Sequence, residues 1–216
     1  ERNAEFLNRL GIKHTQLRVV PISAMKEHTP GLRPKGDYFV VFPGAGSYKR
    51  LLPADSFAYV ARYIAEKTDW RLVICGSKAD IEVADDIIEK VKIKSAMSLA
   101  GKTTIPELVE IIRGASLLVG NETSAVHIAA AVDTPSVCLL GGGHFGRFVP
   151  YPDSVDGTVP LPFYRTMDCF GCNWQCTQTH KPVQPNTCIT SITVEVVTAA
   201  VESIIKERLP HVIESF

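Results

Sequence analysis

The sequence has no surplus of charge of either sign. Its 216 residues carry 23 Lys and Arg against 23 Asp and Glu, which gives a formal net charge of zero. A protein that works by binding nucleic acid or an anionic membrane surface normally carries a basic surplus. The composition therefore argues against both kinds of partner, and we expect no nucleic acid among the partners of this chain.

Long apolar runs are also missing. No run approaches the ~20 residues with which a helix crosses a bilayer, and no signal-peptide pattern opens the chain. Hydrophobic residues make up 45% and charged residues 21%, which is ordinary for a globular protein and too apolar for disorder. Because Glu1 stands where an initiator Met would be expected, we expect part of a longer cytoplasmic protein. We expect any membrane contact of that protein to be peripheral, at the inner face of the cytoplasmic membrane.

The six cysteines fall into two groups. Cys75 and Cys138 end apolar runs and are typical of small buried hydrophobic residues, which favours a reducing compartment. The other four crowd toward the C-terminus: Cys169, Cys172, Cys176 and Cys188. A structural zinc site usually pairs two short Cys-x-x-Cys-type hooks, and only one is clear here. Zinc binding, a disulfide and free thiols therefore stay open.

Apolar runs and amphipathic stretches alternate through the middle of the chain. Short apolar runs predict buried strands at residues 38–42, 71–76, 98–101, 117–120 and 136–140. Helical periodicity predicts helices at residues 54–67, 80–91, 104–113, 123–132 and 193–208. This alternation with short connections is typical of an α/β fold, and it predicts a doubly wound parallel sheet with Rossmann-like topology.

The flanks depart from this alternation. Residues 1–36 open with a short amphipathic stretch at 5–10 and continue as a polar, Pro-dotted segment, which we interpret as a linker. Residues 150–190 are rich in Pro, Cys and aromatic residues and predict an irregular excursion. We expect a sheet domain over residues 37–192 that includes this excursion, followed by a C-terminal helix and tail over residues 193–216.

Ligands of such sheets bind beyond the carboxyl ends of the strands. After the first strand, residues 43–50 read PGAGSYKR. The backbone at Gly46 can approach a phosphate, the Ser47 hydroxyl can donate to it, and Lys49 or Arg50 can neutralise it. The glycine spacing matches neither the P-loop nor the dinucleotide-binding pattern, so a tight turn beside solvated cations stays open as an alternative.

Polar residues also follow the second and fourth strands. Asp80 can accept hydrogen bonds from a ribose diol or cap a helix. Thr123 and Ser124 open a predicted helix, whose free backbone N–H groups form a ready anion site. His127 lies one turn further along the same face, where it is either a ligand contact or a satisfied structural histidine.

Three consecutive glycines follow the fifth strand and precede His144: Gly141, Gly142 and Gly143. Each glycine costs conformational entropy when it is ordered, so a run of three needs a reason. We expect that a ligand or another domain approaches the backbone closely at this point.

Taken in order, these motifs resemble glycosyltransferase family 9, the heptosyltransferase family of lipopolysaccharide core synthesis. The resemblance rests on residues 43–53, 73–76, 99–108, 122–131 and 134–135, and it covers residues 37–141 well. It implies the C-terminal half of a GT-B fold, in which two Rossmann-like domains face each other across a cleft. That half binds the nucleotide-sugar donor, and residues 1–36 correspond to the end of the N-terminal half and the interdomain linker.

The resemblance also implies roles for individual residues. Residues 122–127 match the family's Asp-Thr-Gly-x-x-His, with Glu122 in place of the acid and Ser124 in place of the glycine. The family's Gly-Pro-Thr is replaced here by the glycine run and His144. The resemblance implies phosphate contacts from Gly46, Ser47, Lys49, Arg50, Thr123 and Ser124, and nucleoside or sugar contacts from Asp80, Glu122, His127, Gly142, Gly143 and His144.

The implied activity is inverting sugar transfer from a nucleotide diphosphate sugar, ADP-heptose or a related donor, to a glycan or lipid-linked acceptor. The family's base is an acid on the N-terminal domain, so we expect this chain alone to be inactive. The sequence has no Asp-x-Asp pair that would hold a divalent metal on the diphosphate. A cation and a helix dipole are therefore expected to stabilise the leaving group, with no metal cofactor for catalysis.

Two alternatives stay open. A nucleotide-sugar epimerase can share the GT-B architecture, with His127, His144 and Glu122 as acid and base groups. A nucleotide-binding module without catalysis is the other. If a second domain is absent, the apolar stripe of the 193–208 helix or of residues 5–10 should lack the partner that would cover it.

Overall fold

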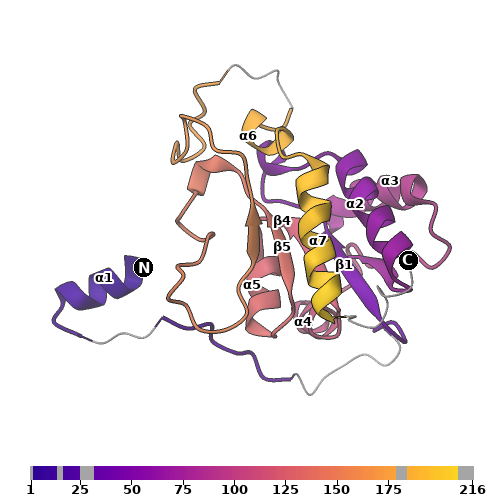
Figure 1. Ribbon diagram of the computed structural model, residues 1–216, viewed down its shortest axis with the longest axis horizontal. Helices are drawn as coiled ribbons and strands as arrows, with labels where there is room; N and C mark the ends of the chain where they lie inside the picture. The colour runs from indigo at the N-terminus through magenta and orange to yellow at the C-terminus, as the bar shows by residue number, and fades with distance from the viewer. Residues whose placement is uncertain (1, 14–16, 25–31, 179–183, 209–216) are drawn as a thin grey trace.

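A six-stranded parallel sheet forms the centre of the computed structural model, which describes residues 2–13, 17–24, 32–178 and 184–208 (Figure 1). The strands are β1 (Tyr38–Phe42), β2 (Arg71–Ile74), β3 (Met97–Ser98), β4 (Leu117–Asn121), β5 (Ser136–Leu139) and β6 (Leu161–Phe163). They lie in the order β3-β2-β1-β4-β5-β6, and every neighbouring pair is parallel. This is the strand order of dinucleotide-binding folds, so the predicted doubly wound sheet is confirmed.

Helices pack on both faces of the sheet, and one helix, the first, lies apart from it. They are α1 (Arg2–Arg9), α2 (Ala54–Lys67), α3 (Ile81–Val91), α4 (Ile105–Arg113), α5 (Ser124–Ala131), α6 (Thr187–Thr190) and α7 (Val194–Arg208). One apolar core joins the sheet to α2, α3 and α7, and a second joins it to α4 and α5. Both faces are covered, which is why β1 is apolar at every position instead of alternating.

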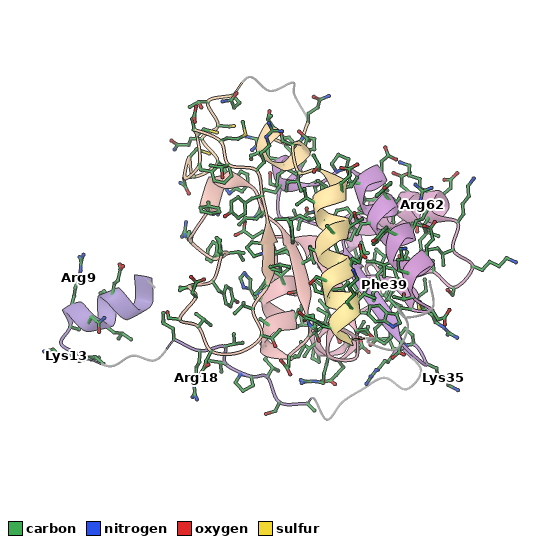
Figure 2. The ribbon with its side chains drawn as sticks, viewed as in Figure 1. Arg9, Lys13, Arg18, Lys35, Phe39 and Arg62 are labelled. Carbon is green, nitrogen blue, oxygen red and sulfur yellow. The ribbon has the colours of Figure 1, made fainter. Side chains whose placement is uncertain are left out.

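Alternate residues of β1 supply the two cores. Phe39 and Val41 contribute to the core under α2, α3 and α7, whereas Tyr38 and Val40 contribute to the core under α4 and α5. Figure 2 shows Phe39 inside the molecule, while Arg62 projects outward from α2. Successive side chains therefore lock both helix layers onto one strand and fix the position of its carboxyl end.

Local sequence sets the start of α4 as predicted. Thr104 caps the helix by accepting a hydrogen bond from the backbone N–H of Glu107, and the Glu107 carboxylate accepts from the backbone N–H of Thr104. Pro106 lies in the first turn, where its missing N–H costs nothing. The reciprocal pair satisfies two of the free donors of the helix end.

The segment 150–190 is only partly irregular. Within it β6 pairs with β5 as an edge strand, and α6 forms a single helical turn. The three residues of β6 are too few to give a periodic pattern, and Pro162 at the centre argues against a strand except at a sheet edge. The sequence prediction missed β6 for that reason, and it also missed α6.

Of the two segments named as alternatives for a missing partner, one is covered and the other is exposed. The α7 stripe of Val197, Val201 and Ile205 is buried in the core with α2. Phe6 and Leu10 are 62% and 61% exposed, and α1 lies apart from the sheet (Figure 1). Among the described residues, no helix combines the length and apolar character needed to cross a membrane.

Candidate functional site

The loops after β1 and β4 meet at the carboxyl edge of the sheet. These two strands are neighbours although they are not consecutive in the chain, and such a switch point leaves a crevice between the loops. A cavity of about 390 Å³ lies there, lined by Gly46, Arg50, Glu122, Thr123, Ser124, His127 and Phe148. All of these except Phe148 are residues for which the sequence predicted donor contacts.

The loop after β1 directs Arg50 into this cavity. Ser47 caps a short 3-10 helix (Tyr48–Arg50), where its Oγ accepts from the backbone N–H of Lys49 at 3.4 Å. A Cβ on Gly46 would come within 2.7 Å of the Arg50 guanidinium, so glycine leaves room for that side chain. Lys49 lines a separate cavity beside it. Of the two cations that the sequence left open, Arg50 is therefore the one that faces Glu122 and the start of α5.

Asn121 holds the two loops together. Its Nδ2 donates to the carbonyl of Pro43 at 2.6 Å, and its Oδ1 accepts from the backbone N–H of Leu52 at 3.3 Å. The side chain is fully buried, so both bonds lie away from water. No role for Asn121 could be predicted from the sequence, because a polar residue type at a strand end does not indicate which groups it will hydrogen-bond.

The start of α5 contributes a capped helix N-terminus and a buried acid. Thr123 caps the helix, and its Oγ1 accepts from the backbone N–H of Ala125 at 3.4 Å. Glu122, the residue before the cap, is 6% exposed, and neither oxygen of its carboxylate has a hydrogen-bond partner among the described residues. Burial raises the pKa of Glu122 to about 7, although nearby Arg50 lowers it.

His127 of α5 lines the same cavity and contacts an aromatic residue of the excursion. Its Nδ1 is 2.7 Å from the hydroxyl of Tyr151, and the two rings are stacked at 15°. Burial lowers the pKa of His127, which keeps the ring neutral at pH 7. If Tyr151 donates to Nδ1, the ring proton is on Nε2, and that N–H can donate a hydrogen bond to a ligand. The structural and the binding interpretations of this histidine are thus compatible.

The glycine run is explained by the chain itself. A Cβ at Gly142 would overlap the ring of Phe170, and a Cβ at Gly143 would overlap the ring of Trp174. The close approach is therefore made by the excursion of the chain itself, and the glycine run does not require the ligand or other domain that the sequence leads one to expect. Both glycines are buried under these rings and do not line the cavity.

His144 and Trp174 form the wall of a smaller cavity. The His144 Nε2 lies 2.9 Å from Oδ1 of Asn173, and its ring meets the Trp174 indole edge-on. The guanidinium of Arg50 sits 5.7 Å from the centre of the same indole. Together with Ser47 and Lys49 these residues line about 290 Å³ next to the main cavity. Sequence reasoning missed Phe148, Tyr151 and Trp174; the only signal for Tyr151 and Trp174 was the aromatic content of the excursion, and Phe148 precedes that segment.

Asp80 has a structural role in the loop after β2. Its Oδ2 accepts from the backbone N–H and from the Oγ of Ser77, both at 2.7 Å, and so completes a capping box. Its carboxylate also lies against Gly44, where a Cβ would come within 2.5 Å of it. Of the two roles that the sequence left open, helix capping is the one that these contacts support.

Replacing Asp80 with Ala is expected to lower the free energy of unfolding by about 0.5–2 kcal/mol, the range for loss of a helix cap. Urea denaturation of the chain would measure this, with Asp85→Ala as control, because Asp85 is exposed on the following helix. An unchanged stability together with weaker nucleotide binding would instead support the ribose contact.

The four cysteines of the excursion lie near one another but form no described metal site. Burial raises the pKa of Cys188, and Cys176, Cys169 and Cys172 add to the effect. All six cysteines of the chain are free thiols. Within the described ranges, no three His, Cys, Asp or Glu residues are placed to hold a metal ion. The structure therefore supports neither the zinc nor the disulfide alternative for Cys169, Cys172, Cys176 and Cys188.

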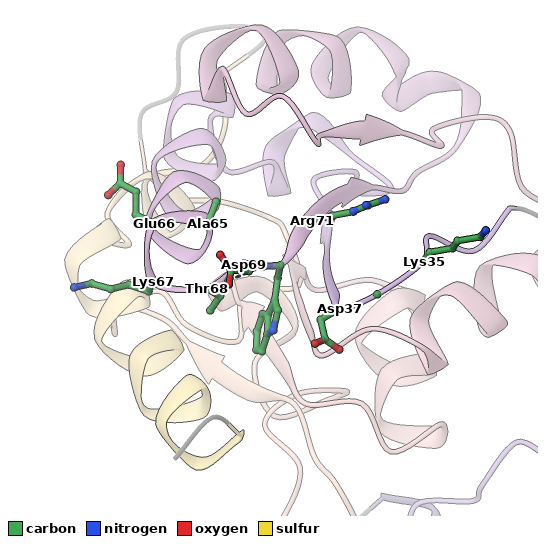
Figure 3. Close-up of a pocket in the computed structure, with 10 residues that line it drawn as sticks. Lys35, Asp37, Ala65, Glu66, Lys67, Thr68, Asp69 and Arg71 are labelled. Atoms are coloured by element: carbon green, nitrogen blue, oxygen red, sulfur yellow. Dashed lines mark hydrogen bonds between the residues drawn. The ribbon is translucent and has the colours of Figure 1, made fainter. Parts of the chain in front are cut away.

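A larger cavity, about 590 Å³, lies at the opposite end of the sheet (Figure 3). It is lined by residues that precede β1 and β2, including Asp37 and Thr68. Figure 3 shows the charged ends of Lys35, Glu66 and Lys67 spreading apart instead of converging. Because ligands of such sheets bind at the carboxyl ends of the strands, we do not assign the site to this cavity.

Comparison with known proteins gives one family. The sequence model of glycosyltransferase family 9 (heptosyltransferase) matches residues 12–170. Lipopolysaccharide heptosyltransferase 3 of Escherichia coli is 30% identical over 162 residues, which make up 72% of this chain and 47% of that protein. This chain thus spans about half the length of that relative.

Solved structures agree on the fold. E. coli ADP-heptose LPS heptosyltransferase II superposes with a TM-score of 0.61 at 19% identity, over 81% of this chain and 48% of that one. The iron-containing heptosyltransferase TibC in complex with ADP-D-β-D-heptose gives 0.53 at 16% identity, over 82% of this chain and 48% of that one. Since the family model covers well over half of the residues, the chain belongs to glycosyltransferase family 9, the heptosyltransferase family.

Proposed function

We propose that this chain binds the nucleotide diphosphate sugar donor of an inverting glycosyltransferase, with ADP-heptose as the expected donor. One observation carries the proposal: a cation, a helix N-terminus and a buried acid line the same cavity between β1 and β4. Two of these, Arg50 and the N–H groups at Thr123 and Ser124, suit a diphosphate. Two similar proteins support the choice of donor: E. coli ADP-heptose LPS heptosyltransferase II, and TibC in complex with ADP-D-β-D-heptose.

The same groups serve the proposed chemistry. An acceptor hydroxyl attacks the anomeric carbon of the donor and loses its proton to a base, while the bond from that carbon to the diphosphate oxygen breaks. Negative charge then develops on the leaving diphosphate, where Arg50 and the start of α5 stabilise it electrostatically. In this proposal these fixed donors take the place of a divalent metal on the diphosphate.

Contacts to the sugar are assigned to two residues beside the diphosphate. His127 lines the main cavity together with Glu122, and His144 lines the adjoining one, which shares Arg50 with it. The acceptor, a glycan or lipid-linked molecule, and the base are assigned to the part of the relatives that this chain does not span. A cytoplasmic location belongs to the same proposal, in keeping with six free thiols.

Isothermal titration calorimetry of the chain with ADP, UDP and GDP tests the proposal. We expect ADP to bind most tightly of these three nucleotides. We expect AMP to bind at least tenfold more weakly than ADP, and adenosine more weakly still, because the phosphates make the charged contacts. Absence of binding by all three nucleotides in the millimolar range would contradict the proposal. Equal binding of ADP and adenosine would contradict the assignment of the cavity to the phosphates.

A further inference from the structure

Glu122 is a buried acid without a partner in a cavity assigned to a diphosphate. The side chain is 94% buried, since 6% is exposed, and neither carboxylate oxygen receives a hydrogen bond from the described residues. An ionised carboxylate in such a place is costly, because it loses water and gains no donor in return. The residue lies directly before the cap of α5 and lines the same cavity as Arg50.

The groups around Glu122 do not supply a firm counter-charge. Among the described residues, Arg50, from the loop after β1, is the one charged group that lowers the pKa of Glu122. Burial, and after it Glu122, raises the pKa of Cys138 on β5, which therefore stays a neutral thiol. His127, from α5, has its pKa lowered by burial and adds no positive charge at pH 7. Within the described part of the chain, the guanidinium of Arg50 thus faces both the acid and any ligand.

We propose that Glu122 meets the diphosphate of the bound donor as a neutral carboxylic acid, so that binding takes up one proton from solvent at Glu122. The inference rests on the proposed function. A diphosphate competes with an ionised Glu122 for Arg50 and repels it, whereas the protonated acid donates a hydrogen bond to a phosphate oxygen. The proton balance is one solvent proton added to the carboxylate for each ligand bound, with no covalent bond made or broken.

The direction of the pH dependence follows from linkage. Burial places the pKa of Glu122 at about 7 in the free chain, so the group is mostly ionised at pH 8.5 and mostly neutral at pH 5.5. If one proton is taken up, affinity for ADP falls toward about tenfold per pH unit above pH 8. The second phosphate ionisation, near a pKa of about 6, is complete in this range and does not contribute to the fall.

The test is calorimetry of the 216-residue chain with ADP at pH 8.5 in two buffers that differ in ionisation enthalpy, which gives the number of protons taken up. Wild type is expected to take up close to one proton more than Glu122→Gln, whose amide imitates the neutral acid. Glu89→Gln, an exposed acid on α3, should behave as wild type. Glu122→Gln should also bind ADP more tightly than wild type at pH 8.5, and equally well at pH 5.5.

Thermal unfolding checks that the Gln variant folds and adds an independent readout. The pKa of Glu122 is higher in the folded state than its ordinary value of 4.5, so its ionisation lowers stability as pH rises from 4.5 to about 7, and the loss is constant above that. Glu122→Gln should therefore raise Tm at pH 8.5 and leave it unchanged near pH 4.

The outcomes separate the two proposals. If ADP binds and wild type takes up no more protons than Glu122→Gln, Glu122 stays ionised in the complex, for example as an acceptor from a sugar hydroxyl, and the inference is overturned while the proposed function stands. If no nucleotide binds, the proposed function is overturned and this inference is overturned with it.

Discussion

Arg50→Ala should weaken ADP binding by about 10- to 150-fold, whereas Lys49→Ala should change it by less than about threefold. Hydrogen bonds to charged groups contribute about 1.5–3 kcal/mol, and about 1.4 kcal/mol corresponds to a factor of ten. Arg50 lines the cavity with Glu122 and Thr123, while Lys49 lines only the neighbouring cavity. Calorimetry of both variants under one buffer and salt condition measures the contrast.

Two further variants sharpen this result. Arg50→Lys keeps the charge but loses the planar fork and the contact with the Trp174 ring, so it should recover only part of the affinity. In Arg50→Ala the pKa of Glu122 should rise further, because Arg50 lowers it in the wild type. A loss for Lys49→Ala as large as that for Arg50→Ala would refute the assignment of Arg50 as the phosphate cation.

The sequence was most informative where local patterns decide the outcome. Apolar runs and 3.6-residue periodicity predicted β1, β2, β4, β5 and the helices between them, because a sheet covered on both faces needs these patterns. The capping residues Thr104 and Glu107 set the start of α4 without help from distant segments. Parallel topology then predicts that loops 43–50 and 121–124 meet, since the carboxyl ends of parallel strands share one edge.

What the sequence could not predict depends on contacts between distant segments. The choice between Lys49 and Arg50 is made by the short 3-10 turn after Ser47, which points one of two adjacent cations inward. The contact of Tyr151 with His127 joins residues 24 positions apart in the sequence, and no local pattern indicates it. The family resemblance helped with loop identities, but it was close only over residues 37–141 and so gave no contacts for the excursion that covers the glycine run.

The glycine run offers the sharpest test of how the excursion is attached. Neither Gly142 nor Gly143 is among the glycines with positive φ, so an alanine at either position is compatible with the backbone. The obstacle is space, because a Cβ at Gly143 would overlap the indole of Trp174. That indole also contacts Arg50 and His144, which line the smaller cavity. By leaving room for the indole, Gly143 therefore also sets the positions of these two side chains.

Gly143→Ala should therefore lower the free energy of unfolding by about 1–3 kcal/mol, the range for overpacking a close-packed site. In a Trp174→Ala background the same change should cost less than about 0.5 kcal/mol, because the overlapping ring is gone. Urea denaturation of the four proteins of this cycle measures the coupling. Additive costs would mean that Trp174 is not what Gly143 makes room for, and the glycine run would again need a ligand or another domain to explain it.

If the coupling is found, Gly143→Ala should also weaken ADP binding, because the displaced indole no longer supports Arg50. For the same reason, Trp174→Phe should weaken ADP binding less than Trp174→Ala does.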